Sequence, residues 1–138
     1  MDGSNRSRGA VIQPVVIDAS AVLAYAKREA GFERVRPAID GALISSVNFA
    51  EVIGKLALEG HDADRLGAKL VGLGLVVEPF IWADAKVTGA LAPGSRTLGL
   101  SLADRACLAL ARRVDRPVLT ADRAMAKADL GVPVELIR

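Results

Sequence analysis

Short apolar runs rich in β-branched residues alternate with helix-like segments along most of this chain, and this alternation constrains its fold. The runs predict strands over residues 15–17, 42–45, 75–77, 117–120 and 134–137. The intervening segments carry apolar residues at helical spacing and predict helices over 21–28, 32–39, 47–59, 62–73, 80–91, 101–114 and 124–130. Strands that alternate with helices form βαβ units. The sequence therefore predicts an α/β fold with a mainly parallel central sheet of four to five strands.

The length of 138 residues suits one domain with one sizeable core. Residues 1–13 are rich in Gly, Ser and Arg without apolar periodicity, so we expect a flexible lead-in there and a single domain over 14–138. No apolar run reaches the roughly 20 residues of a bilayer-spanning helix, and the polar start lacks the apolar stretch of a secretory signal. These features predict a cytoplasmic protein without a membrane partner.

Four acidic residues each stand where an apolar strand-like run gives way to a helix-like one. They are Asp18, Glu51, Asp104 and Asp122. In a parallel α/β sheet such junctions gather at the carboxyl edge, where open sheets of this class bind ligands. We therefore expect the four carboxylates to form one negative pocket.

Each acid alone also fits a helix N-terminus, where acids and small polar residues are favoured. Ser20 is suited to cap the helix after the first strand, and Ser101 with Asp104 has the spacing of a capping box. Four carboxylates together are a different matter. Two unit charges about 4 Å apart repel by about 4 kcal/mol at an effective dielectric of 20. A bound cation removes that repulsion, so the joint pattern favours a metal site.

The residue types favour a hard, oxygen-ligated cation. One histidine, His61, and one cysteine, Cys107, exclude a multi-Cys or His-rich zinc site, and Cys107 lies in an apolar helical stretch that predicts burial. Carboxylates alone suit Mg²⁺, with Mn²⁺ as a substitute. The chain has a net charge of +2, from 18 basic and 16 acidic residues. A basic surface around an acidic pocket would attract phosphate esters, which such metal sites hydrolyse.

Four segments in order resemble the PIN domain, and their residues are most similar to those of the VapC toxins of type II toxin–antitoxin pairs. They read VVIDASAVLA, SSVNFAEV, GLSLADRACLALA and VLTADR, and the match runs from residue 15 to the C-terminus. The resemblance implies a three-layer α/β/α PIN-like domain and a Mg²⁺-dependent endoribonuclease that cuts a structured RNA of the tRNA or rRNA class. It also implies a homodimer and a cognate VapB-like antitoxin.

The resemblance assigns roles to individual residues. It makes Asp18, Glu51, Asp104 and Asp122 the catalytic, metal-binding acids, and it makes Ser20, Asn48 and Thr120 supporting residues that orient carboxylates or a metal-bound water. Helix capping is the other interpretation of these three. Phosphate contact is a weaker prediction for three arginines near the acids, which ordinary solvated charge also explains: Arg96, Arg105 and Arg123.

Other interpretations stay open. A PIN-like protein-binding module without catalysis would keep the fold, and a structure-specific DNA nuclease would use the same metal chemistry. A dinucleotide-binding fold is disfavoured because the first strand lacks a GxGxxG motif. Away from the acids, residues 93–99 read as a loop, and Arg112, Arg113 and Arg116 read as a solvated face.

Overall fold

The computed structural model describes residues 14–138, and it confirms the predicted α/β architecture. Five strands form one sheet: β2 (Val16–Ile17), β3 (Leu43–Ser45), β4 (Val76–Glu78), β5 (Val118–Thr120) and β6 (Val134–Leu136). Every neighbouring pair is parallel, and the order across the sheet is β4-β3-β2-β5-β6. The predicted lead-in over 1–13 lies outside the described residues.

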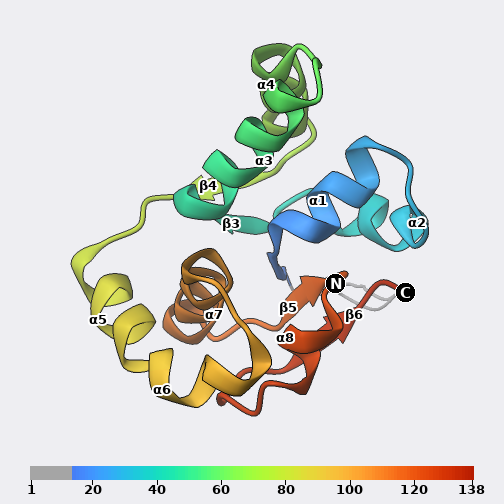
Figure 1. Ribbon diagram of the computed structural model, residues 1–138. Helices are drawn as coiled ribbons and strands as arrows, with labels where there is room; N and C mark the ends of the chain where they lie inside the picture. The colour runs from blue at the N-terminus through green and yellow to red at the C-terminus, as the bar shows by residue number, and fades with distance from the viewer. Residues whose placement is uncertain (1–13) are drawn as a thin grey trace, which may run out of the picture.

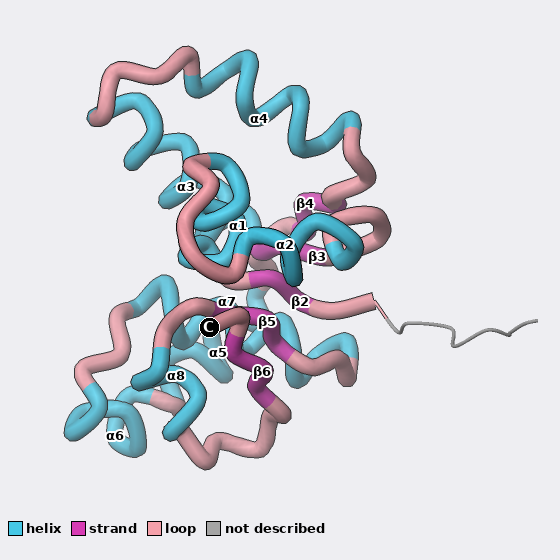
Figure 2. Tube along the Cα trace, turned by 90° about the vertical axis from the view of Figure 1, so that its right-hand side faces the viewer, coloured by secondary structure: helices cyan, strands magenta, loops and turns pink. Residues whose placement is uncertain are grey.

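Helical segments link the strands and cover both faces of the sheet (Figures 1 and 2). They are α1 (Ala19–Ala26), α2 (Phe32–Val35), η1 (Arg36–Ala38), α3 (Ser46–Leu58), α4 (Ala63–Gly72), α5 (Trp82–Ala90), α6 (Ala92–Ser95), η2 (Arg96–Leu98), α7 (Leu102–Val114) and α8 (Arg123–Lys127), where η marks a 3₁₀ turn. None of the described helices has the length and apolar character needed to cross a membrane.

Alternating strand residues divide the interior into two cores, one on each face of the sheet. Ile17 and Leu119 pack with side chains from α1, α3 and α4. Their strand neighbours Val16 and Val118 face the opposite way and pack with α7 and α8. Successive side chains of a strand point to opposite faces, so a strand buried on both faces needs apolar residues at consecutive positions. This explains the continuous apolar runs in the sequence.

The direction of the chain reverses beside β2. From β2 the chain moves outward through β3 to β4, then crosses back to place β5 on the other side of β2 and continues to β6. Ligands of open α/β sheets bind at this kind of switch point, outside the carboxyl ends of the strands. Here the switch point lies at the ends of β2 and β5, next to Asp18 and Thr120.

Two local predictions are wrong. The segment 93–99 is not an open loop, because Ala92–Ser95 and Arg96–Leu98 form two short helical turns that end at Gly99 with a positive φ of 67°. Pro93 suits the first turn of a helix, which explains how a composition typical of loops forms α6. Ser20 does not cap the first helix, since α1 begins at Ala19 and Asp18 occupies the N-cap position.

Candidate active site

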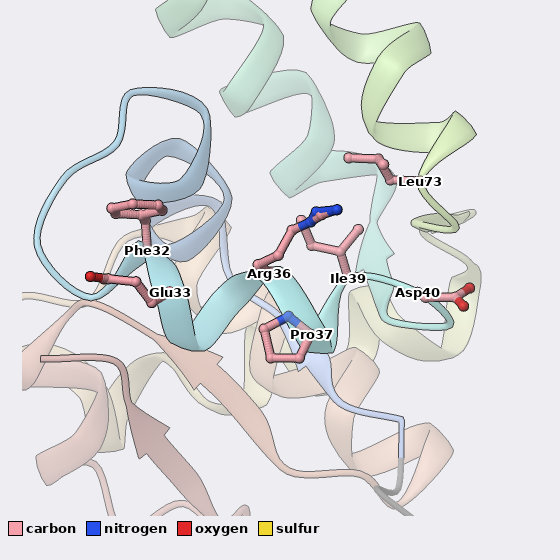
Figure 3. Close-up of a pocket in the computed structure, with 7 residues that line it drawn as sticks. All are labelled: Phe32, Glu33, Arg36, Pro37, Ile39, Asp40 and Leu73. Atoms are coloured by element: carbon pink, nitrogen blue, oxygen red, sulfur yellow. The ribbon is translucent and has the colours of Figure 1, made fainter.

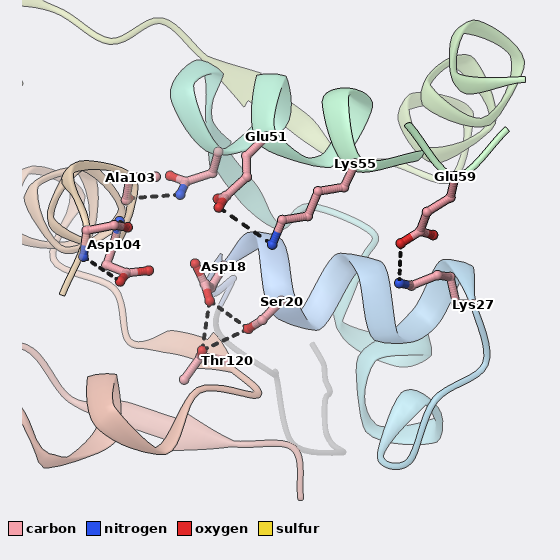
Figure 4. Close-up of polar contacts among 11 residues, drawn as sticks. Asp18, Ser20, Lys27, Glu51, Lys55, Glu59, Ala103, Asp104 and Thr120 are labelled. Atoms are coloured by element: carbon pink, nitrogen blue, oxygen red, sulfur yellow. Dashed lines mark hydrogen bonds and ion pairs between the residues drawn. The ribbon is translucent and has the colours of Figure 1, made fainter. Parts of the chain in front are cut away.

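Asp18 is a buried carboxylate held by two hydroxyl groups. It follows β2 at the centre of the sheet and is only 3% exposed. Its Oδ2 accepts hydrogen bonds from Ser20 Oγ at 2.6 Å and from Thr120 Oγ1 at 2.9 Å (Figure 4). Although Asp18 is at the N-cap position of α1, its carboxylate caps no backbone N–H. The capping interpretation therefore fails for Asp18, and its side chain is oriented by one local hydroxyl, of Ser20, and one distant hydroxyl, of Thr120.

The two hydroxyls are fixed in turn by the backbone after β5. Ser20 Oγ accepts from the N–H of Ala121 at 2.9 Å, and Thr120 Oγ1 accepts from the N–H of Asp122 at the same distance. Each hydroxyl thus receives a hydrogen bond from a backbone amide while it donates to Asp18. This arrangement positions Asp18 and joins the ends of β2 and β5.

Glu51 reaches the same edge from α3. Ser45 caps this helix by accepting from the N–H of Val47, so Asn48 lies inside the first turn and Glu51 one turn further on. Asn48 is fully buried, and its Nδ2 donates to the carbonyl of Ala103 in α7 at 2.9 Å. Because Ala103 immediately precedes Asp104, this bond ties the helix of Glu51 to the helix of Asp104. The Oδ1 atom of Asn48 is buried with no hydrogen-bond partner.

Asp104 lies in the first turn of α7, where it completes the predicted capping box. Ser101 Oγ accepts from the N–H of Asp104, and Asp104 Oδ2 accepts from the N–H of Ser101 at 2.8 Å. The capping interpretation is correct for Asp104. It does not exclude a second role, because Asp18, Glu51 and Asp104 extend from three different elements toward the same region (Figure 4).

The three acids act on one another electrostatically. Burial raises the pKa of Asp18, and the charge of Asp104 raises it further, against the lowering effect of the two hydroxyls. Burial and the charges of Asp18 and Asp104 likewise raise the pKa of Glu51, although Lys55 opposes them. Each shift means that the ionised form is disfavoured in the metal-free protein. A cation near these oxygens would reverse that penalty.

Cys107 is buried beneath this site, as predicted. The thiol lies one turn after Asp104 on α7 and is fully buried. Its pKa is raised well above the ordinary value, first by burial and then by Asp18, Asp104 and Glu51. A thiol in this state is a neutral, apolar filler. The charges of all three acids therefore reach the same buried thiol.

The Asp122 carboxylate has a local contact of its own. Its Oδ1 accepts from the N–H of Ala124 at 2.9 Å, which makes it the N-cap of α8. The connection to Asp18 runs through Thr120, which bonds both residues. The structure thus brings Asp18, Glu51 and Asp104 into mutual electrostatic range, whereas Asp122 lies in the loop after β5 and its charge is not among the causes of the raised pKa values of Asp18 and Glu51.

The oxygen-only donor set and the orphaned Asn48 Oδ1 fit a hard divalent cation. The present side-chain positions do not yet form a coordination shell. Among residues 14–138, no three His, Cys, Asp or Glu side chains are grouped closely enough to hold a metal ion. The carboxylates would therefore have to turn closer together when a cation binds.

The predicted phosphate-binding arginines have different surroundings. Arg96 and Arg123 are exposed, in η2 and at the start of α8. Arg105 turns toward α5, where its Nη1 donates to the carbonyl of Thr88 at 2.9 Å. Of the arginines predicted to be a solvated face, Arg113 is an exception, because it forms a bidentate ion pair with the buried Asp84.

The sequence did not single out two lysines, of which one, Lys55, lies beside a site acid. Lys55 Nζ lies 3.9 Å from Glu51 Oε2, and Lys27 Nζ lies 3.2 Å from Glu59 Oε2 (Figure 4). The spacing of four residues between Glu51 and Lys55 is a pairing signal in a helix and could have identified Lys55. The contact between Lys27 and Glu59 joins α1 to α3 and has no such local signal.

A separate recess of about 530 Å³ lies on α2 and η1, away from the acids (Figure 3). Its apolar walls come from Phe32, Pro37, Ile39 and Leu73, and Arg36 and Asp40 stand at its sides. None of the predicted site residues lines it. The recess is therefore a surface distinct from the candidate active site.

The structure is an all-parallel α/β sheet with acidic side chains gathered at its switch point, where open sheets of this kind bind ligands. Residues 15–130 match the PIN domain family. The chain belongs to the PIN domain family, which confirms the predicted fold. No curated protein matches the sequence.

Solved structures share this fold at low sequence identity. A toxin–antitoxin complex from Klebsiella pneumoniae has a TM-score of 0.70 at 18% identity, over 90% of this chain and 98% of that one. A VapC toxin from Mycobacterium tuberculosis that cleaves the sarcin–ricin loop has a TM-score of 0.68 at 13% identity, over 83% and 95%. A DNA-bound VapBC from Salmonella typhimurium has a TM-score of 0.67 at 18% identity, over 92% and 100%.

Proposed function

We propose that this chain is a Mg²⁺-dependent endoribonuclease, with Mn²⁺ as a substitute, and the toxin of a VapBC-type toxin–antitoxin pair. The observation that carries the proposal is the convergence of Asp18, Glu51 and Asp104, from β2, α3 and α7, at the switch point of a PIN fold. Toxins are among the proteins that share this fold, and one of them is described as cleaving the sarcin–ricin loop.

The reaction proposed is hydrolysis of a phosphodiester bond in a structured RNA of the tRNA or rRNA class. Asp18, Glu51, Asp104 and Asp122 would hold the metal, which when bound lowers the pKa of an attacking water and stabilises charge on the phosphate oxygens. The chain's own contribution is positioning. Ser20 and Thr120 orient Asp18, and Asn48 sets the distance between the helices of Glu51 and Asp104.

A VapB-like antitoxin and a second copy of the chain are the proposed partners. The apolar recess around Phe32, Ile39 and Leu73 offers a surface for a protein segment that does not overlap the acids. The exposed Ile81 and Trp82 beside edge strand β4 support a homodimer. Both partners are inferred from exposed apolar surface together with the fold's similarity to toxin–antitoxin complexes.

The decisive experiment compares the wild-type protein with Asp104→Asn. Asparagine keeps an oxygen that can accept from the N–H of Ser101, so the capping box and the fold should survive. We expect Mg²⁺-dependent cleavage of total RNA by the wild type and a reduction of at least about 100-fold in the variant, the scale for removing one group that stabilises developing charge. Asp129→Asn, at an exposed acid outside the site, is the matched control.

The same samples distinguish the alternative functions. Cleavage of duplex or flapped DNA in preference to RNA would identify a DNA nuclease. A protein-binding module would cleave neither substrate, and Mg²⁺ would not raise its melting temperature. Binding of Mg²⁺ at about 100 times its Kd should stabilise the wild type by about 2.7 kcal/mol. The absence of both cleavage and this stabilisation would refute the proposed function.

A further inference from the structure

A groove of about 430 Å³ runs between α1 and α3, and Ser20, which bonds Asp18, is among its lining residues. Ser20, Leu23 and Lys27 line it from one face of α1, and Lys55, Leu58 and Glu59 line it from α3. Figure 4 shows the two helices side by side, with the Lys27–Glu59 contact at the end remote from Asp18. The groove therefore leads from the acids to the far ends of both helices.

Two residues connect the groove directly to the acids. Ser20 lines its inner end and donates to Asp18 Oδ2. Lys55 lines its α3 wall and lies 3.9 Å from Glu51. If a phosphodiester of a nucleic acid strand lay at the acids, the adjoining nucleotides on one side would lie at the end of the groove that Ser20 and Lys55 line.

The groove carries more positive than negative side chains. Lys27, Lys55 and Arg138 face two acids, Glu29 and Glu59. The ion pairs among them are at the surface, with every side chain at least a quarter exposed. Exposed pairs of this kind contribute about 0–1 kcal/mol, so the cations can exchange a carboxylate for another anion at little cost.

An apolar contact completes the groove. Leu58 is 90% exposed although it is a large apolar side chain, and it stands in the groove beside the two lysines. A ligand that offers both anionic groups and flat apolar faces would match this combination. Nucleic acid strands provide phosphates for the ammonium groups and bases or riboses for the leucine.

Resting on the proposed nuclease function, we propose that the groove between α1 and α3 holds the RNA strand on one side of the scissile phosphate. Lys55 and Lys27 contact its phosphates, and Leu58 packs against a base or ribose. RNA is favoured over a protein segment because two residues of the groove, Ser20 and Lys55, contact Asp18 and Glu51, where the phosphodiester would lie, and because the lysine side chains that line the groove are long and flexible.

The test measures RNA binding apart from cleavage, in an Asp104→Asn background without added metal. Binding of a labelled oligouridine is measured as a function of salt for this protein and for Lys27→Ala and Lys55→Ala added to it. Removing one lysine that binds a phosphate should reduce the slope of log K against log salt by about 0.7. We expect the double replacement to reduce the slope by about 1.4 in total. Lys27→Arg and Lys55→Arg keep the charge and should restore it.

Lys86→Ala, which removes one exposed positive charge from α5 outside the groove, is the matched control and should leave the slope unchanged. Unchanged slopes for both groove variants would overturn the proposal. Weaker binding of the antitoxin with unchanged RNA binding would overturn it in favour of a protein-binding groove. Reduced slopes in a protein whose wild type cleaves no RNA would support the groove and refute only the hydrolysis. Cleavage of RNA by the wild type, with no slope change in the lysine variants, would support the hydrolysis and refute the groove.

Discussion

At the scale of single residues, the candidate site is a set of carboxylates whose ionisation is costly without a cation. Asp18 has the most enclosed position, and two hydroxyls only partly offset its burial. Enzymes and metal proteins commonly keep such unfavourable charges where they bind ligands. The cost should therefore be measurable as a change in stability of the metal-free protein.

Replacing Asp18 with asparagine should stabilise the metal-free protein and abolish cleavage. Because burial raises the pKa of Asp18 above its ordinary 3.8, the folded state binds the proton more tightly than the unfolded chain. The free energy of unfolding therefore falls as the pH rises from 3.8 through the raised pKa. Asp18→Asn removes this decrease, so the free energy of unfolding of the variant should exceed that of the wild type by more as the pH rises.

Melting temperatures in the presence of a chelator test this expectation. Near neutral pH we expect the melting temperature of Asp18→Asn to lie above that of the wild type. At a pH near the ordinary pKa of aspartate the advantage should be small. Asp129→Asn should show no such trend. An advantage that shrinks as the pH rises would contradict the burial argument.

At the scale of elements, the helix that carries Asp104 is held in place by an ion pair far from the acids. Arg113, near the end of α7, donates from Nε to Asp84 Oδ1 at 2.7 Å and from Nη2 to Asp84 Oδ2 at 3.1 Å. Asp84 lies in the first turn of α5 and is 2% exposed. This pair and the bond from Arg105 to Thr88 fasten α5 along α7 at two points.

Removing Arg113 should destabilise the fold, because a buried carboxylate would be left without its partner. Breaking a fully buried pair costs about 3–5 kcal/mol, and we expect about 2–3 kcal/mol here because Arg113 is partly exposed. Urea unfolding of Arg113→Ala measures this value. Arg112→Ala, at an exposed neighbour, should change stability by less than about 0.5 kcal/mol. Equal effects of the two substitutions would show that the Asp84 pair contributes little.

At the scale of the whole molecule, one open edge of the sheet lies next to exposed apolar residues. β4 ends the strand order, and Trp82, which follows it at the start of α5, is 77% exposed. Trp82 is close to Lys86, whose Nζ is 5.8 Å from the ring centroid. A large aromatic ring at this exposure is a typical anchor of a protein interface.

The proposed homodimer should therefore depend on Trp82. We expect the wild-type protein to sediment as a dimer. Trp82→Glu should sediment as a monomer with an unchanged circular dichroism spectrum, because it would place a charge where the dimer buries the indole ring. Leu58→Glu, which adds the same charge at another exposed apolar residue, should remain dimeric. A monomeric wild type would contradict the homodimer itself. A dimeric Trp82→Glu would place the interface elsewhere.

The sequence by itself determined the order of elements, the parallel sheet and the burial of Cys107, because apolar periodicity and capping residues act over a few neighbouring positions. It also drew attention to the four acids, since their positions near the ends of strands and starts of helices are local features; their role at a metal site stays a prediction. The capping contacts of Asp104 and Asp122 are local, and the sequence indicated them. Only the tertiary structure decided that Asp18 bonds Thr120, 102 positions away across the sheet. The pairing of Arg113 with Asp84 and of Lys27 with Glu59 likewise depended on how helices pack. Such contacts join residues distant in sequence, and no local pattern encodes the distance between them.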